Sequence, residues 1–303
     1  MLKQGSEGAA VKRVQTLIGV KASGVFDART AQRVKLFQRR HRLGVDGVVG
    51  PLTWGAMVAE AARQRKVDAL WPRVSIVRID LPQSDDLTEL IEKGVSYGHL
   101  RTRADLAKIL GLVFAQLDGS GVVLTTSGGM RSLRGTVTQS RSSTSLHYVG
   151  RAIDLGVYTG AVDPRVDPFL VAVDEDLKAA RRFRVYARAE DVDHPLVEKR
   201  TFMALSRKKR RPVQVEGVPC VDITALFARM GLHGIAARRW AWDAPCSGNG
   251  LSGLEWWHFQ WEEGLEEGLT AFGDELLCVH GYDRASASGP WAHAGAVWGG
   301  KFR

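Results

Sequence analysis

Two short segments of the chain carry residues whose types and spacing suit metal chemistry. In the first, His147 follows a Ser/Thr-rich loop, and Asp154 comes seven residues later in an apolar run. In the second, Glu255 precedes His258 by three residues among aromatic side chains. Two imidazoles and a carboxylate can hold Zn²⁺ with one open position, where zinc lowers the pKa of water to about 7.

Glu255 distinguishes this pattern from a chance pairing of His and Asp, which is more often structural. A carboxylate in an apolar strand is costly to bury unless it has a task there. If His258 is the third metal ligand, Glu255 faces the activated water, takes its proton during attack and delivers it to the leaving amine. The four residues together predict metal-assisted hydrolysis of an amide bond.

The elements that must position these residues belong to an α+β region. Alternating and apolar runs predict strands, and three-to-four spacing predicts helices. We expect strands at 74–81, 121–126, 152–157 and 257–261, and helices at 87–93 and 104–117. The long stretch at about 160–250 contains helical pieces and the basic run 207–211. We interpret that run as a solvated loop, because aromatic residues that could stack on bases do not accompany it.

The first sixty residues form a separate module with an internal repeat. Residues 24–30 recur as residues 47–53, with glycine and threonine at the same spacing. Each copy is a turn that opens a helix, with Asp27 as the cap of one and Pro51 in the first turn of the other. With an earlier helix, this predicts a bundle of three. The third helix has its apolar positions at Leu52, Trp54, Met57 and Val58.

Charge limits the classes of partner. The 303 residues carry 42 Lys and Arg against 33 Asp and Glu, a net charge of +9. Residues 1–60 hold 10 basic and 4 acidic side chains, a net of +6, so residues 61–303 hold 32 and 29, a net of +3. This excess favours a polyanionic partner, either a wall polymer, a membrane surface or nucleic acid.

Composition excludes several classes of protein. A hydrophobic content of 45% with 25% charged residues is typical of a globular chain and excludes a disordered or collagenous one. No apolar run approaches the roughly 18 residues of a membrane helix. Three widely spaced cysteines suggest neither a disulfide framework nor a cysteine metal knuckle, and the N-terminus does not read as a secretory signal.

The N-terminal module resembles the three-helix peptidoglycan-binding module of bacterial wall hydrolases. The resemblance covers nearly all of residues 1–60 and rests on residues 2–8 and on the run from Phe37 to Trp54, which reads F-Q…L-x-x-D-G-x-V-G-x-x-T-W. It implies peptidoglycan as the partner, and the local charge of +6 agrees with an anionic wall.

The metal segments resemble the zinc D,D-peptidases of the wall, which are D-alanyl-D-alanine carboxypeptidases, dipeptidases and related L-alanyl-D-glutamate endopeptidases. The signature S-x-H-x-x-G-x-A-x-D is complete at Ser145, His147, Gly150, Ala152 and Asp154, and E-x-W-H is complete at Glu255, Trp257 and His258. The resemblance implies Zn²⁺ as the cofactor, with His147, Asp154 and His258 as its ligands and Glu255 as the catalytic base.

The same resemblance implies three further site residues. Arg131 follows a small-residue turn and would stabilise the oxyanion, with Arg134 as a competitor for that role. Ser145 and Trp257 would contact the substrate. The interval between Asp154 and Glu255 is long for this family and implies an insertion that shapes or covers the site.

We therefore predict a peptidoglycan-binding domain at 1–62, a helical linker at 63–75 and a zinc peptidase domain at 76–303 with an insertion at about 160–245. The expected fold is α+β, a three-helix bundle followed by a hedgehog/D-Ala-D-Ala peptidase-like domain with a central antiparallel sheet. The predicted function is that of an endolysin-like peptidoglycan peptidase. The alternatives are a D-alanyl-D-alanine carboxypeptidase or dipeptidase, and a wall-binding protein without catalysis.

We expect a monomer that binds neither nucleic acid nor, stably, a membrane. We further expect synthesis in the host bacterial cytoplasm without a signal peptide, as in phage endolysins, followed by action in the periplasm or wall after release or export.

Overall fold

The computed structural model describes the whole chain except residues 65–66, 135–141, 143, 248–250, 266–271 and 282–303. The chain divides into two compact units. The first comprises Met1–Ser75, Arg131–Val149 and Gly264–Arg303, and the second comprises Ile76–Met130 and Gly150–Glu263. In the described part of the chain, no helix combines the length and the hydropathy that crossing a membrane requires.

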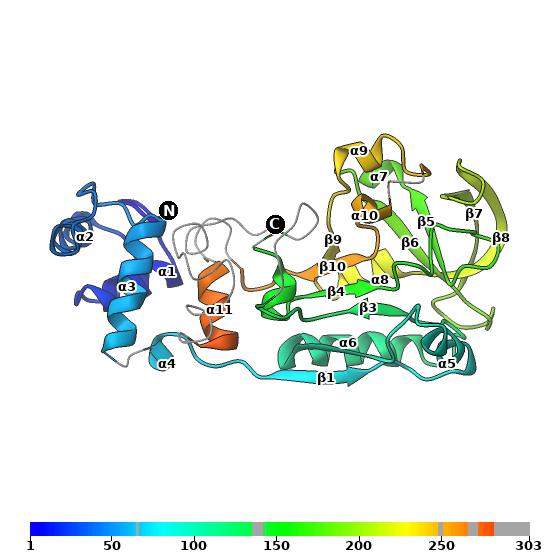
Figure 1. Cartoon of the computed structure of the whole chain (residues 1–303), viewed down its shortest axis with the longest axis horizontal. Coiled ribbons are helices and arrows are strands. Elements are labelled where there is room, and N and C mark those ends of the chain that lie inside the picture. The colour runs from blue at the N-terminus through cyan, green and yellow to red at the C-terminus, as the bar shows by residue number, and fades with distance from the viewer. Residues whose placement is uncertain (65–66, 135–141, 143, 248–250, 266–271, 282–303) are drawn as a thin grey trace. The chain divides into compact units, whose positions relative to one another are not determined.

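The N-terminal module consists of three helices, as the sequence predicts (Figure 1). These are α1 (Ala9–Leu17), α2 (Ala28–Arg40) and α3 (Pro51–Arg63). The Asp27 carboxylate caps α2 by accepting a hydrogen bond from Thr30 N at 2.7 Å. On α3, Trp54, Met57 and Val58 are buried, but Leu52, which we expected on the same face, is 69% exposed.

The sequence repeat is also a structural repeat, centred on two buried glutamines. The Gln15 side chain is hydrogen-bonded to the turn at 24–30, and the Gln38 side chain to the turn at 47–53. In each copy the side-chain amide accepts from the glycine N–H and donates to the next carbonyl and to the threonine hydroxyl, at 2.9 to 3.1 Å. The two turn glycines have φ of +84° and +77°, a left-handed backbone that favours glycine. One glutamine thus explains the fixed spacing of glycine and threonine in each copy.

A tryptophan fixes the connection that follows α3. Within the predicted linker at 63–75, α4 (Val67–Leu70) is helical and residues 72–75 are not. Trp71 is fully buried, packs edge-on against Trp54 at 6.0 Å and donates to Asp274 Oδ1 at 2.6 Å. Asp274 lies on α11 (Phe272–His280) and also pairs with Arg13 of α1 at 3.5 Å. The connection is therefore anchored on both α3 and α11.

The second unit contains the antiparallel sheet that we expected. Its strand order is β3-β4-β10-β9, and a separate pair, β1-β2, precedes it in the chain. The strands are β1 (Ile76–Asp80), β2 (His99–Arg103), β3 (Thr126–Gly128), β4 (Ala152–Leu155), β9 (Leu232–Gly234) and β10 (His258–Trp261). The prediction of a strand at 121–126 is mostly wrong, because only Thr126 pairs with a neighbouring strand.

Helices cover this unit with apolar residues at three-to-four spacing. They are α5 (Asp85–Glu92) and α6 (Ala104–Leu117), which agree with the predicted helices, and α6 packs on β1 and β2 (Figure 1). The face of α6 that carries Leu106, Leu110, Val113 and Leu117 is buried in the main hydrophobic core. This core also contains Ile153 of β4 and Phe259 of β10, so it supports both central strands.

The predicted insertion at 160–245 consists mainly of strands rather than of the helical pieces that we expected. Four antiparallel strands close into a small barrel in the order β5-β6-β8-β7. The elements are β5 (Phe169–Val173), α7 (Glu175–Lys178), β6 (Phe183–Arg188), β7 (Glu198–Ala204), β8 (Val213–Asp222), α8 (Ile223–Arg229) and α9 (Arg239–Trp242). Figure 1 shows the barrel strands beside α9 and α10 (Leu251–Leu254), which lead the chain to β10.

Candidate metal centre

Three short elements position the predicted metal ligands. His147 lies in a 3-10 helix, η1 (Leu146–Val149), whose Tyr148 carbonyl accepts from His280 Nε2 of α11 at 2.7 Å. Asp154 lies on β4 and His258 begins β10. The antiparallel register pairs His258 directly with Asp154, so these two side chains project from neighbouring backbone positions.

The structure brings the three side chains together. One ligand atom from each of His147, Asp154 and His258 lies within 4.8 Å of the others, and all three residues are buried. Nitrogen and oxygen ligands about 2.0 to 2.2 Å from a tetrahedral ion stand roughly 3.4 Å apart, so a small contraction would let this group hold one. Two imidazoles and a carboxylate are ligands that zinc accepts, and the donor set therefore fits the ion.

His258 contacts two neighbouring polar side chains. His258 Nδ1 lies 3.1 Å from Asp154 Oδ1, and its Nε2 lies 3.2 Å from Gln260 Oε1. Gln260 stands two residues after His258 on the same strand, and side chains at that spacing share one face of a sheet. Gln260 was not among the candidate residues, although the period of two along the strand could have predicted it.

Gly150 of the signature lies where the backbone leaves no room for a side chain. Its φ is +67°, and a Cβ at this position would lie 2.9 Å from Arg103 N. The Gly150 carbonyl accepts from Thr102 Oγ1 at 2.6 Å and from Arg103 N at 3.2 Å. These bonds join the segment between His147 and Asp154 to β2.

Glu255 is buried in a strained backbone conformation. Its φ is +54°, which for a residue with a Cβ costs on the order of 1 kcal/mol. The Glu255 carbonyl accepts from His258 N at 3.1 Å, so a tight turn leads from this residue into β10. Burial raises the pKa of the Glu255 carboxyl group, while the charges of His258 and Arg238 oppose that rise.

Arg238 is a neighbour of the site that our sequence analysis did not single out. Its Nε lies 3.4 Å from Glu255 Oε1, and its side chain is 42% exposed. Arg238 immediately precedes α9, in the predicted insertion, and belongs to neither motif. No local pattern could have predicted this pair, because the two residues come together only through the fold of the insertion.

The other predicted site residues have diverse surroundings. Arg131 N donates to His147 O at 3.0 Å, which places its backbone beside a ligand, and Arg134 is exposed. Ser145 is buried, and its carbonyl accepts from Tyr148 N at 3.1 Å. Trp257 is buried in the main core and packs edge-on against Trp256. The substrate contacts of Arg131, Ser145 and Trp257 stay predictions.

Comparisons with known proteins support the N-terminal module. The family described as "Putative peptidoglycan binding domain" matches residues 9–57, which span α1, α2 and most of α3. The chain is also 34% identical over 74 residues to the N-acetylmuramoyl-L-alanine amidase CwlL of Bacillus licheniformis. That match covers 22% of this chain and only 21% of the relative. No solved structure matches the chain significantly.

Proposed function

We propose that this chain is a zinc-dependent peptidoglycan peptidase that binds the bacterial wall through residues 1–62 and hydrolyses an amide bond in stem or cross-link peptides. The observation that carries the proposal is the buried group of His147, Asp154 and His258, with Glu255 three residues before the last ligand. The match to a peptidoglycan-binding family supports the wall as the partner.

The proposed chemistry follows from the types of these side chains. Zinc held by His147, Asp154 and His258 would supply a Lewis acid and a water of lowered pKa. Glu255 takes a proton from the attacking water and returns it to the leaving amine nitrogen, so the proton balance closes within one carboxylate. Arg131 would donate to the oxyanion that develops on the scissile carbonyl, which its fixed fork of donors suits.

The relative's name describes an amidase, an enzyme class that cuts a different bond, but its match covers too little of either chain to assign that bond here. We favour a peptide bond because the four-residue site has the pattern of the wall D,D-peptidases. The second candidate function for the same site is that of a D,D-carboxypeptidase or dipeptidase, which would trim stem peptides.

Mass spectrometry of walls digested by wild type and by Glu255→Gln tests the proposal. We expect new amino termini within stem or cross-link peptides from wild type alone. Release of intact stem peptides from the sugar strand would show an amidase instead. Zinc-free wild type with full activity, or products from both proteins, would refute the mechanism.

A further inference from the structure

The basic run 207–211 forms an ordered, solvent-exposed turn between β7 and β8. Four of its residues, 208–211, are exposed. Ser206 Oγ accepts from Lys209 N at 3.2 Å and lies 3.3 Å from the Val162 carbonyl, to which it donates. The amides of Arg207 and Lys208 also donate to carbonyls of the loop at 160–167, at 3.1 and 3.0 Å. The turn is thus bound to the loop that follows β4.

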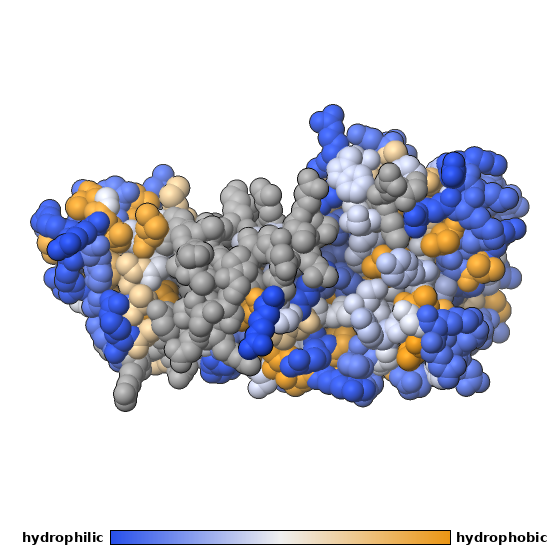
Figure 2. Space-filling model, viewed as in Figure 1, coloured by the Kyte–Doolittle hydropathy of each residue, from blue (hydrophilic) through white to orange (hydrophobic). Residues whose placement is uncertain are grey.

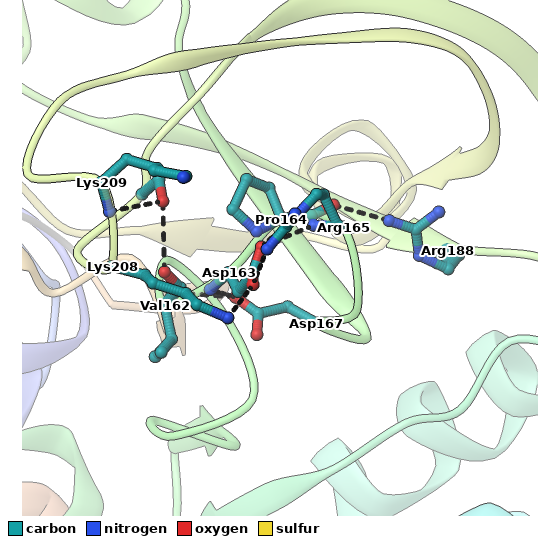
Figure 3. Close-up of polar contacts among 9 residues, drawn as sticks. Val162, Asp163, Pro164, Arg165, Asp167, Arg188, Lys208 and Lys209 are labelled. Carbon is teal, nitrogen blue, oxygen red and sulfur yellow. Dashed lines mark hydrogen bonds and ion pairs between the residues drawn. The ribbon is translucent and has the colours of Figure 1, made fainter.

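The Asp163 carboxylate pairs with one cation from the turn at 207–211 and one from the loop at 160–167 (Figure 3). Asp163 Oδ2 accepts from Lys208 Nζ and from Arg165 Nη2, each at 2.8 Å. These two bonds hold the pKa of Asp163 well below its usual range. Asp167 closes the loop by accepting from the backbone amides of Val162 and Asp163 at 2.8 and 2.9 Å. The cations are therefore held at one place on the barrel rather than dispersed.

These two segments account for the whole positive excess of the chain beyond residue 60. Residues 160–167 and 205–212 contain six basic and two acidic side chains, a net of +4, whereas residues 61–303 together have a net of +3. The side chains of Arg165 and Lys208 stay 64% and 58% exposed despite their ion pairs. Figure 2 shows that the surface over the barrel strands is mainly hydrophilic on the face in view.

We propose that this basic edge, defined as the exposed side chains of Arg165 and residues 208–211, binds the carboxylates of peptidoglycan stem peptides as a second attachment point to the wall. The inference rests on the proposed function, in which the bacterial wall is the partner of this protein. Arginine matches a carboxylate with a planar fork of donors, and a wall presents such carboxylates in series. Two attachment points on one polymer make the second binding event intramolecular, which raises the overall affinity without a new high-affinity pocket.

Sedimentation of the full chain with purified walls tests the basic edge. The Glu255→Gln background keeps the walls intact, and Lys209→Glu/Arg211→Glu is compared with Lys108→Glu/Arg229→Glu, which makes the same charge change at exposed positions of α6 and α8. At low salt we expect about fivefold weaker binding for the first pair and less than about twofold for the control, with the difference lost at high salt. The neutral pair Lys209→Gln/Arg211→Gln should bind with an affinity between those of the parent and of the charge-reversed pair. It keeps the test valid if the charge-reversed pair fails to fold.

Walls whose carboxylates have been converted to amides identify the ligand. On these walls the difference between the parent and Lys209→Glu/Arg211→Glu should disappear. Equal losses for both charge-reversed pairs, or none, would overturn the proposal. A difference that persists on amidated walls but disappears after phosphate polymers are stripped would overturn it in favour of a phosphate ligand. Since both charge-reversed pairs are compared in the same background, failure of the peptidase proposal leaves this result interpretable.

Discussion

Arg238 Nε lies 3.4 Å from Glu255 Oε1, and this ion pair joins the predicted insertion to the proposed catalytic base. Glu255 is held in a left-handed backbone conformation with its carboxyl group mostly buried, so it has little freedom to find another partner. The insertion thus supplies the ion-pair partner of the proposed base, in addition to the barrel.

Replacement of Arg238 should impair catalysis without loss of the metal. We expect Arg238→Ala to lower kcat/KM about tenfold, as is typical when an orienting partner of an active-site group is removed, and Arg238→Lys to recover part of the activity. Arg239→Ala, next to it and 86% exposed, is the matched control. Steady-state kinetics with zinc analysis of each variant makes the measurement, and full activity in Arg238→Ala would contradict the positioning role.

The pH profile gives a second test of the same pair. Glu255 must be ionised to accept a proton, so activity should fall as the pH drops through its pKa. Because Arg238 lowers that pKa, its removal should move the acid limb of kcat/KM to higher pH. A limb that stays in place in Arg238→Ala would mean that another group controls it.

Removal of a proposed ligand should release zinc. We expect about one zinc per chain in wild type and less than about one tenth in His147→Ala or His258→Ala, because a catalytic site has only three protein ligands. His233→Ala is the control, since His233 is an exposed histidine on β9 in the same sheet. Metal analysis after dialysis against a weak chelator makes the comparison, and equal zinc in all variants would place the ion elsewhere.

The buried glutamine of each repeat should contribute more to the stability of the bundle than any exposed residue of the bundle does. Gln38→Ala leaves the Gly47 amide, the Val48 carbonyl and the Thr53 hydroxyl without the amide that now bonds them. We expect a loss of about 2 kcal/mol in the free energy of unfolding of the bundle, and less than about 0.5 kcal/mol for the exposed Gln32→Ala. Hydrogen exchange at the backbone amides of α2 and α3 measures the effect, and unchanged protection in Gln38→Ala would disprove it.

Asp167 should make the stability of the insertion depend on pH. Burial raises its pKa to about 6, so the folded state binds a proton that the unfolded state releases near pH 4. Stability from this group is therefore full below about pH 4 and is lost as the pH rises through about 6, by on the order of 2 kcal/mol. Asp167→Asn can keep both backbone bonds through its carbonyl oxygen and should lack this dependence. Urea unfolding of both proteins at pH 4.5 and 7.5 tests the difference.

Sequence reasoning reached furthest where the relevant interactions are local. The caps at Asp27 and Pro51, the repeat at 24–30 and 47–53, and the helices α5 and α6 follow from residues a few positions apart, whose preferences act before any distant contact forms. The four residues of the candidate site could also be predicted, because each motif spans ten residues or fewer. The strand at 121–126 was mispredicted because an apolar run does not determine whether a partner strand lies beside it.

The sequence by itself determined which side chains could form a metal site and which module resembles a wall-binding domain, since both depend on short patterns. Only the tertiary structure decided that His258 pairs in register with Asp154, that Arg238 reaches Glu255, and that residues 169–222 close into a barrel with a basic edge. The physical reason is that strand pairing and ion pairs between distant segments depend on the free energy of the whole fold. Local propensity carries no information about which distant residue will be the partner.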